Sequence, residues 1–405
     1  MGKSPEKNII RLGWVALLND ISGETIMRLV PFYVSGVLGA PMMVVGAIEG
    51  FADATSTLLK PFFGKISDRL GKRKEFVVFG YAIPGVARSL LALATSPLSV
   101  GLLRVADRFA KAVRTAPRDA LISVTPSEKK QGWRFGINRA MDTLGALLGI
   151  GLFGLFVYGK TGGGGSSLQL TSGEWRALCV ASLLPCLACM AIVVWGILDI
   201  DQAPRTSERP EPARFSPILK KYLLAVGLFG LASSSDAFIL LRGKDLGFSL
   251  LETLGMISML NLASSATALP ASVLSDRLGR KTLITAGWLI YVFTYAAIGL
   301  GFGRSPVAYA IVLGFYGLFY GFTEGVEKAW VADLTKPEDR GRAYGWFGLI
   351  TGLTALPASV VFGWAWDRFG DRLPFLADAV LAILALGALW ALVPSSAQAK
   401  SSPSG

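Results

Sequence analysis

Three charged side chains recur at helical spacing inside the first apolar segment. Asp20, Glu24 and Arg28 are each four residues apart, which places them on one face of a helix. A carboxylate in a dry environment holds a proton more tightly, and a nearby cation weakens that hold, so such a row can take up and release protons. Asp20 and Glu24 are therefore predicted proton carriers, and Arg28 is a predicted contact for a substrate anion.

A second row of charges lies in the fourth apolar segment, residues 97–122. Each of its members has another member three or four residues away, so they form one stripe on a helix: Arg104, Asp107, Arg108, Lys111, Arg114 and Arg118. We interpret the basic members as a site for an anionic group. A structural alternative is open for each of them, because buried charges are normally paired whatever the function. Asp107 with Arg104 or Lys111, and Asp142 with Arg139, are examples.

In the later apolar segments we single out four acids, Asp236, Glu324, Glu327 and Asp333, beside the basic residue Lys328. We expect an anionic group to bind the first half of the chain and a cationic or hydroxyl group to bind the second. Glu324 is the third predicted proton carrier. The predicted substrate-binding residues are Arg28, Arg104, Arg108, Lys111, Arg114, Arg139, Asp142, Asp236 and Glu327.

The elements that hold these charges are apolar segments long enough to cross a bilayer. The chain has 405 residues, of which 52% are hydrophobic and only 17% charged, far fewer charges than a soluble domain carries. Backbone in lipid must satisfy its own hydrogen bonds, so the segments are predicted helices. They span 9–38, 42–64, 75–95, 97–122, 133–158, 174–198, 218–241, 249–274, 281–301, 305–333, 340–366 and 373–393. The predicted fold class is an all-α membrane protein with twelve transmembrane helices.

A charged, proline-rich stretch divides the chain into two halves of six helices. The predicted organisation is an N-terminal bundle (1–198), a cytoplasmic linker (199–217), a C-terminal bundle (218–394) and a cytoplasmic tail (395–405). Lysine and arginine concentrate in the loops on the side of both termini, which indicates that both termini are cytoplasmic. The net charge of +12 then reports topology, so we expect no nucleic-acid partner.

Two short sequences repeat between the halves. Residues 67–71 (SDRLG) recur at 275–279, and Gly132-x-x-Phe135-Gly136 recurs as Gly341-x-x-Tyr344-Gly345. Parallel six-helix repeats are typical of one large class of transporter. The stretch 64–74 (GKISDRLGKRK) resembles the loop between helices two and three of the major facilitator superfamily, and residues 274–281 resemble its second copy.

This resemblance implies a transporter whose helices one, four, seven and ten line a central cavity, and these are the segments that carry the charges. It implies that the signature loops gate the protein: Gly64, Asp68, Arg69, Gly71, Arg73, Asp276, Arg277, Gly279 and Arg280. Arg108 fits the family's helix-four arginine motif, but Lys111 stands where that motif has glutamine. Residues 145–154 match half of the helix-five glycine pattern of antiporters, which weakly favours export.

Three patterns that suggest enzymes are rejected on their context. The P-loop-like residues 154–161 and the dinucleotide-like Gly149-x-Gly151-x-x-Gly154 lie in an apolar helix without a preceding strand. Cys186 and Cys189 have redox spacing, but we interpret them, with Cys179, as packing thiols. The absence of histidine removes imidazole catalysis and imidazole metal ligands.

The predicted function is secondary active transport, with no enzyme activity, cofactor or metal. The expected cargo is a small polar or amphiphilic, anionic or zwitterionic solute, coupled to protons and carried by a monomer in the cytoplasmic membrane. Two alternatives stay open: efflux of lipophilic cations or drugs by proton antiport, and a membrane sensor of the same fold that does not transport.

Overall fold

The computed structural model describes residues 6–123, 131–161, 170–197, 215–336 and 339–394, and it is helical with no strand in these ranges. The first half contains α1 (Glu6–Phe32), α2 (Met42–Leu70), α3 (Arg73–Leu90), α4 (Pro97–Ser123), α5 (Gln131–Thr161), α6 (Ser172–Ala181) and α7 (Leu183–Ala191). The second half contains α8 (Pro217–Ala232), α9 (Ala237–Asp245), α10 (Leu250–Leu278), α11 (Arg280–Gly299), α12 (Pro306–Asp333), α13 (Arg340–Phe369) and α14 (Leu373–Leu392). The predicted all-α membrane fold is confirmed.

Ten stretches of helix in the described part of the chain are long and apolar enough to cross a membrane. Helices α1 and α4 are not among them, because the charge rows beginning at Asp20 and Arg104 interrupt their apolar faces. A charged side chain at the bilayer centre costs about 3 kcal/mol even on lenient scales, so such residues normally face protein or water. Helices α1 and α4 must therefore turn their charged faces away from lipid.

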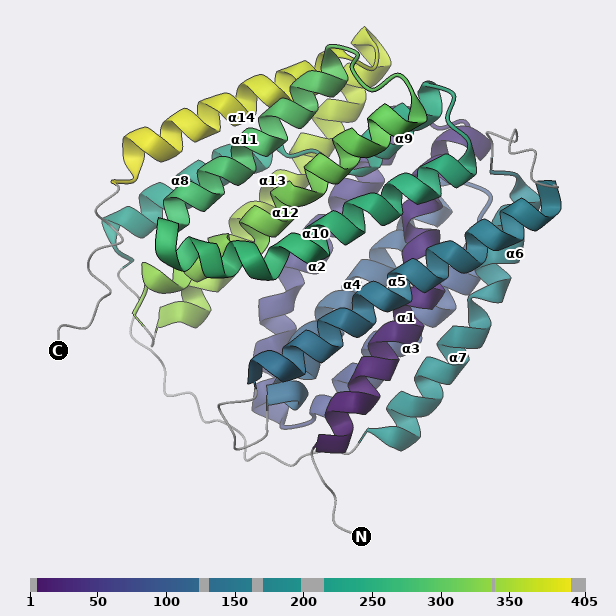
Figure 1. Cartoon of the computed structure of the whole chain (residues 1–405). Helices are drawn as coiled ribbons and strands as arrows, with labels where there is room; N and C mark the ends of the chain where they lie inside the picture. The colour runs from purple at the N-terminus through teal and green to yellow at the C-terminus, as the bar shows by residue number, and fades with distance from the viewer. Residues whose placement is uncertain (1–5, 124–130, 162–169, 198–214, 337–338, 395–405) are drawn as a thin grey trace. The chain divides into compact units, whose positions relative to one another are not determined.

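The chain forms two compact units with the same internal packing. The first comprises residues 1–40, 51–208 and 249–251, and the second 41–50, 209–248 and 252–405. In the first unit α1 packs on α5 and α7, and α3 packs on α4 (Figure 1). In the second unit α8 packs on α13 and α14, and α11 packs on α12. Each helix of one set has its counterpart in the other set, in the same order along the chain.

Two predicted spans are not single helices, and the first of them, 174–198, is divided into α6 and α7 at Ser182. The segment 218–241 is divided into α8 and α9 by residues 233–236, Ser-Ser-Ser-Asp, which are not helical. Serine and aspartate side chains compete with helical hydrogen bonds by bonding to nearby backbone. Tyr291 donates to the carbonyl of Ala232 at 2.6 Å, and Ser359 accepts from the amide of Ser235 at 3.2 Å. Neighbouring helices thus satisfy backbone groups that the break exposes.

The three cysteines lie in α6 and α7 and are not bonded to one another. Cys179 and Cys189 are buried, and Cys189 packs in an apolar cluster with Leu12 and Val77. Cys186 lies directly against Gly85 of α3. All three thiols pack against their surroundings, as the sequence predicted.

Candidate functional site

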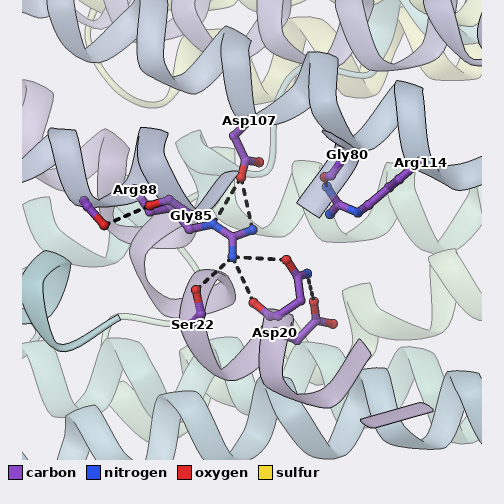
Figure 2. Close-up of polar contacts among 9 residues, drawn as sticks. Asp20, Ser22, Gly80, Gly85, Arg88, Asp107 and Arg114 are labelled. Carbon is purple, nitrogen blue, oxygen red and sulfur yellow. Dashed lines mark hydrogen bonds and ion pairs between the residues drawn. The ribbon is translucent and has the colours of Figure 1, made fainter. Parts of the chain in front are cut away.

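Arg88 of α3 is the centre of a buried polar network that joins three helices (Figure 2). Its guanidinium pairs with Asp107 of α4 at 3.0 Å, and both side chains are 5% exposed. It also donates to the backbone carbonyl of Asn19 at 2.9 Å and to Ser22 Oγ at 3.0 Å, both on α1. The guanidinium lies directly over Gly23, where any side chain would collide with it. Arg88 therefore ties α1, α3 and α4 together.

The network continues from Arg88 to a predicted proton carrier. Arg88 donates to Asn19 Oδ1 at 3.2 Å, and Asn19 Nδ2 donates to Asp20 Oδ1 at 2.8 Å. Because the side-chain oxygen of Asn19 accepts from Arg88, the side-chain NH2 group of Asn19 is turned toward Asp20. Asp20 also lies near the charges of Asp142, Glu24 and Lys111. Acids and a base from three helices thus surround Asp20.

The basic residues of α4 have different surroundings along the helix. Arg108 lies 3.5 Å from Asp53 of α2, and Arg114 donates to the carbonyl of Gly80 at 2.8 Å while lying over the ring of Tyr81. Lys111 makes no ion pair with any carboxylate in the described part of the chain. Arg108, Lys60 and Arg114 are close enough to repel its charge, and Glu24 attracts it.

The remaining predicted contacts of the first unit are spread over α1 and α5. Arg28 pairs with Glu24 at 3.0 Å, and Asn138 donates to Asp142 at 3.3 Å. The side chain of Arg139 lies outside the described residues. Asp107 pairs with Arg88, so the partners expected for it, Arg104 and Lys111, were the wrong ones. Sequence spacing within α4 could not show a partner on another helix.

Among the predicted acids of the second unit, Asp236 and Glu327 are half-buried and Glu324 is exposed. Asp236 Oδ1 accepts from Tyr316 at 2.9 Å and from Tyr320 at 2.7 Å. Glu327 accepts from the indole of Trp288 at 3.1 Å. Glu324 is 56% exposed and pairs with Lys328 at 3.3 Å. Asp236 and Glu327 are thus held by aromatic donors.

Aromatic rings fill the space beside these acids. Phe229 stacks on Trp288 with ring centroids 4.2 Å apart, and Tyr291 stacks on Tyr295 at 4.0 Å. Phe319 contacts both Phe229 and Tyr291. Rings of this kind offer flat apolar faces and, through tyrosine and tryptophan, hydrogen-bond donors.

The predicted gating residues lie mostly on helix ends. Gly64, Asp68 and Arg69 belong to the last turns of α2, and only residues 71 and 72 connect α2 to α3. Gly71 has φ of +66°, a conformation that suits glycine at the end of a helix. Arg73 pairs with Asp68 at 3.0 Å.

The second signature repeats this arrangement. Asp276 and Arg277 lie in the last turn of α10, and Gly279 has φ of +93°. Arg280 pairs with Asp276 and, at 3.0 Å, with Asp333 of α12. Ser67 and Ser275 each bond to the carbonyl three residues earlier. The sequence repeat is therefore also a structural one.

Several participants in these networks were not among the predicted site residues. They are Asn19, Ser22, Arg88, Trp288, Tyr316 and Tyr320. The buried acid Asp378 of α14 was also missed. It could have been found in the same way as the other predicted acids, because it is an acid inside an apolar segment. Tyr316 and Tyr320 are four residues apart, but tyrosine in an apolar helix carries no distinctive signal without its partner.

A family model described as Major Facilitator Superfamily matches residues 12–264 and 223–405. The chain belongs to the major facilitator superfamily. An uncharacterised MFS-type transporter of Methanocaldococcus jannaschii is 30% identical over 395 residues, covering 93% of each chain. Multidrug resistance protein 2 of Bacillus subtilis is 32% identical over 112 residues, 27% of each chain.

The fold of this superfamily member also matches a solved structure over its whole length. The structure is that of a bacterial homologue of the human lysosomal transporter Spinster, in an inward-facing and occupied conformation. Its TM-score is 0.77 at 16% sequence identity, with 100% of both chains covered. The chain is thus a multi-pass membrane transporter of this superfamily, and its cargo must be inferred from its own residues.

Proposed function

We propose that this transporter exports a small anionic or zwitterionic solute across the cytoplasmic membrane in exchange for protons. The observation that carries the proposal is the crowding of cations around Lys111. Lys111 has three basic neighbours, Arg108, Lys60 and Arg114, which repel its charge, and one acidic neighbour, Glu24, which attracts it. Like charges held close together repel, so an anionic group placed among them relieves that repulsion.

Access to this cluster is consistent with a ligand site. The Arg108 side chain is 22% exposed and its partner Asp53 is 44% exposed, whereas the Arg88–Asp107 pair is enclosed. An anion can therefore replace Asp53 on Arg108 without entering the buried network. We assign the enclosed pair to structure, and Arg108 and Lys111 to substrate binding.

The second unit offers chemistry that differs from that of the Lys111 cluster. Asp236 and Glu327 are carboxyl groups set among aromatic rings. A carboxylate and an aromatic face both attract a cation, and a carboxylate also accepts from a hydroxyl. The side chains of the second unit therefore suit an amine or a hydroxyl group, whereas the basic cluster of the first unit suits an anion.

Proton coupling is assigned to the acids of the first unit. Asp20 lies near Asp142 and Glu24, and neighbouring carboxylates that are both ionised destabilise each other. A proton on one of them relieves this repulsion, and an arriving substrate anion changes the balance again. The export direction rests on the glycine pattern of α5 alone. Two glycines of this pattern, Gly145 and Gly149, lie directly against the α1 backbone, so they also serve helix packing.

The test is thermal stabilisation of the purified protein by anionic, zwitterionic and cationic small molecules at two pH values. A bound ligand raises stability by RT ln(1 + [L]/Kd). We expect stabilisation by an anion or zwitterion that is lost in Lys111→Gln and Arg108→Ala but kept in Lys220→Gln, an exposed lysine of α8. Binding that survives in both variants contradicts the site assignment.

A second candidate is efflux of lipophilic cations. It is supported by the aromatic surroundings of Asp236 and Glu327 and by the partial similarity to a multidrug resistance protein. Stabilisation by lipophilic cations only, lost in Asp236→Asn and unaffected by Lys111→Gln, would favour this function over transport of anions.

A further inference from the structure

A buried carboxyl group on α14 takes no part in the networks described so far. Asp378 is 7% exposed, and its Oδ2 atom has no hydrogen-bond partner among the described residues. No lysine or arginine in the described part of the chain pairs with it. An ionised carboxylate that is buried without a compensating charge costs several kcal/mol, so this group needs a cation.

Asp378 lies beside the break between α8 and α9. Ser234 of the break contacts the Asp378 carboxyl group through its hydroxyl and its backbone. The same hydroxyl is 3.4 Å from the Tyr295 hydroxyl. One side of the carboxyl group is thus fixed by the break, and Oδ2 is left available.

The titratable groups that face Asp378 from the surrounding elements are tyrosines and one acid. Helix α11 contributes Tyr291 and Tyr295, both within electrostatic range of Asp378. The break contributes Asp236, which also acts on Tyr295 and is held by Tyr316 and Tyr320 of α12. Helix α13 contributes the hydroxyl of Ser359 to the same break. The site therefore offers acidic and neutral oxygen groups.

Carboxylate and hydroxyl oxygens of this kind suit a hard cation. Hard cations take carboxylate, hydroxyl and backbone carbonyl ligands. In membrane transporters, the unwound backbone of a discontinuous helix coordinates the coupling Na⁺ or H⁺. At the α8–α9 break the Ser234 hydroxyl supplies a neutral oxygen beside Asp378, and Asp378 supplies a negative charge with an unused oxygen.

We propose that Asp378, together with the Ser234 region of the α8–α9 break, forms a binding site for a small monovalent cation, either H⁺ or Na⁺. The cation neutralises Asp378 and thereby joins α14 to the break. This site is separate from the acids of the first unit to which proton coupling was assigned. Cation binding at Asp378 does not depend on which solute is transported.

The experiment measures thermal unfolding of the whole purified protein, without substrate, in Na⁺, K⁺, Ca²⁺ or N-methylglucamine, at pH 6 and pH 8.5. A cation at a hundredfold its Kd multiplies the ratio of folded to unfolded protein by about 100. We expect the wild type to be stabilised by Na⁺ over K⁺, or by the lower pH in the absence of Na⁺. The first result identifies Na⁺ as the occupant, and the second identifies a proton.

The variants decide whether the effect belongs to Asp378. Asp378→Asn removes the charge at nearly constant volume, and we expect it to lose the response while unfolding at or above the wild-type temperature in N-methylglucamine at pH 8.5. The matched control is Asp245→Asn, an exposed acid at the end of α9, which should keep the response. A second readout, binding of ²²Na⁺ to the wild type, is independent of whether a variant folds.

Three results would overturn the proposal. They are a wild type that responds neither to Na⁺ nor to pH, a response that Asp378→Asn keeps, and stabilisation by Ca²⁺ only. Solute binding through Lys111 can succeed or fail in any of these cases, since those measurements use different ligands and different variants.

Discussion

At the scale of single residues, Arg88 shows how a charge is accommodated inside a membrane protein. Its guanidinium meets a carboxylate, a backbone carbonyl, an amide oxygen and a hydroxyl. With those partners the desolvation of the charge is compensated, whereas removal of one partner leaves another charge buried alone. Arg88 is therefore a structural residue whose loss also affects the orientation of Asn19 beside Asp20.

We expect Arg88→Met to reduce the free energy of unfolding by about 3–5 kcal/mol, because Asp107 is then buried without a counter-ion. The double variant Arg88→Met/Asp107→Leu should regain much of that loss. The measurement is a double-mutant cycle by steric trapping or thermal unfolding in detergent.

The matched control is Lys72→Met, which breaks the ion pair of Lys72 with Glu75. The Lys72 side chain is 60% exposed and the Glu75 side chain 55%. Exposed pairs contribute about 0–1 kcal/mol. A double variant no more stable than Arg88→Met would show that the charge of Asp107 is not what makes the single change costly.

At the scale of elements, close contact between helices depends on glycine at a few positions. A Cβ atom on Gly23 would lie 2.0 Å from Arg88 Cζ. Nothing lies within 4 Å of the Cβ position of Gly151 on α5. Glycine is therefore needed for close packing at position 23 but not at position 151.

We predict that Gly23→Ala lowers the free energy of unfolding by about 1–3 kcal/mol, because the added methyl group must displace the Arg88 guanidinium. Gly151→Ala should be neutral or stabilise the protein by up to about 1 kcal/mol, since alanine is the better helix former. Unfolding of both variants under identical conditions tests the contrast, and equal effects would contradict the contact assigned to Gly23.

The break between α8 and α9 makes a related prediction. Tyr291→Phe removes the donor to the Ala232 carbonyl, and an unsatisfied buried acceptor costs about 1–3 kcal/mol. Faster amide hydrogen exchange in residues 229–240 should accompany the loss of stability. Tyr344→Phe, an exposed tyrosine of α13, is the control and should leave both quantities unchanged.

At the scale of the whole molecule, charge distribution predicts the topology. Lysine and arginine lie mainly in the loops on the side of the termini, and such loops stay in the cytoplasm. We expect a C-terminal green fluorescent protein fusion to fluoresce and a C-terminal alkaline phosphatase fusion to be inactive. A phosphatase inserted after residue 165, between α5 and α6, should be active. An active C-terminal phosphatase together with an inactive one after residue 165 would contradict the proposed orientation.

The sequence by itself determined the architecture of this transporter. Segment length and apolarity identify membrane helices, since lipid forces backbone groups to bond within a helix, and the repeated SDRLG residues relate the halves. The charged rows on α1 and α4 were also visible, because helical spacing places residues four apart on one face. These features are local, so they can be read without knowing which helix lies beside which.

Only the tertiary structure decided how the charges are paired. Asp107 meets Arg88 of α3 and not a neighbour on its own helix, and Asp236 meets tyrosines of α12. Helical spacing shows which residues share a face, but a partner on another helix depends on packing between segments far apart in the sequence. The same reason explains the missed break at residues 233–236, whose exposed backbone groups are satisfied by Tyr291 and Ser359 from two other helices.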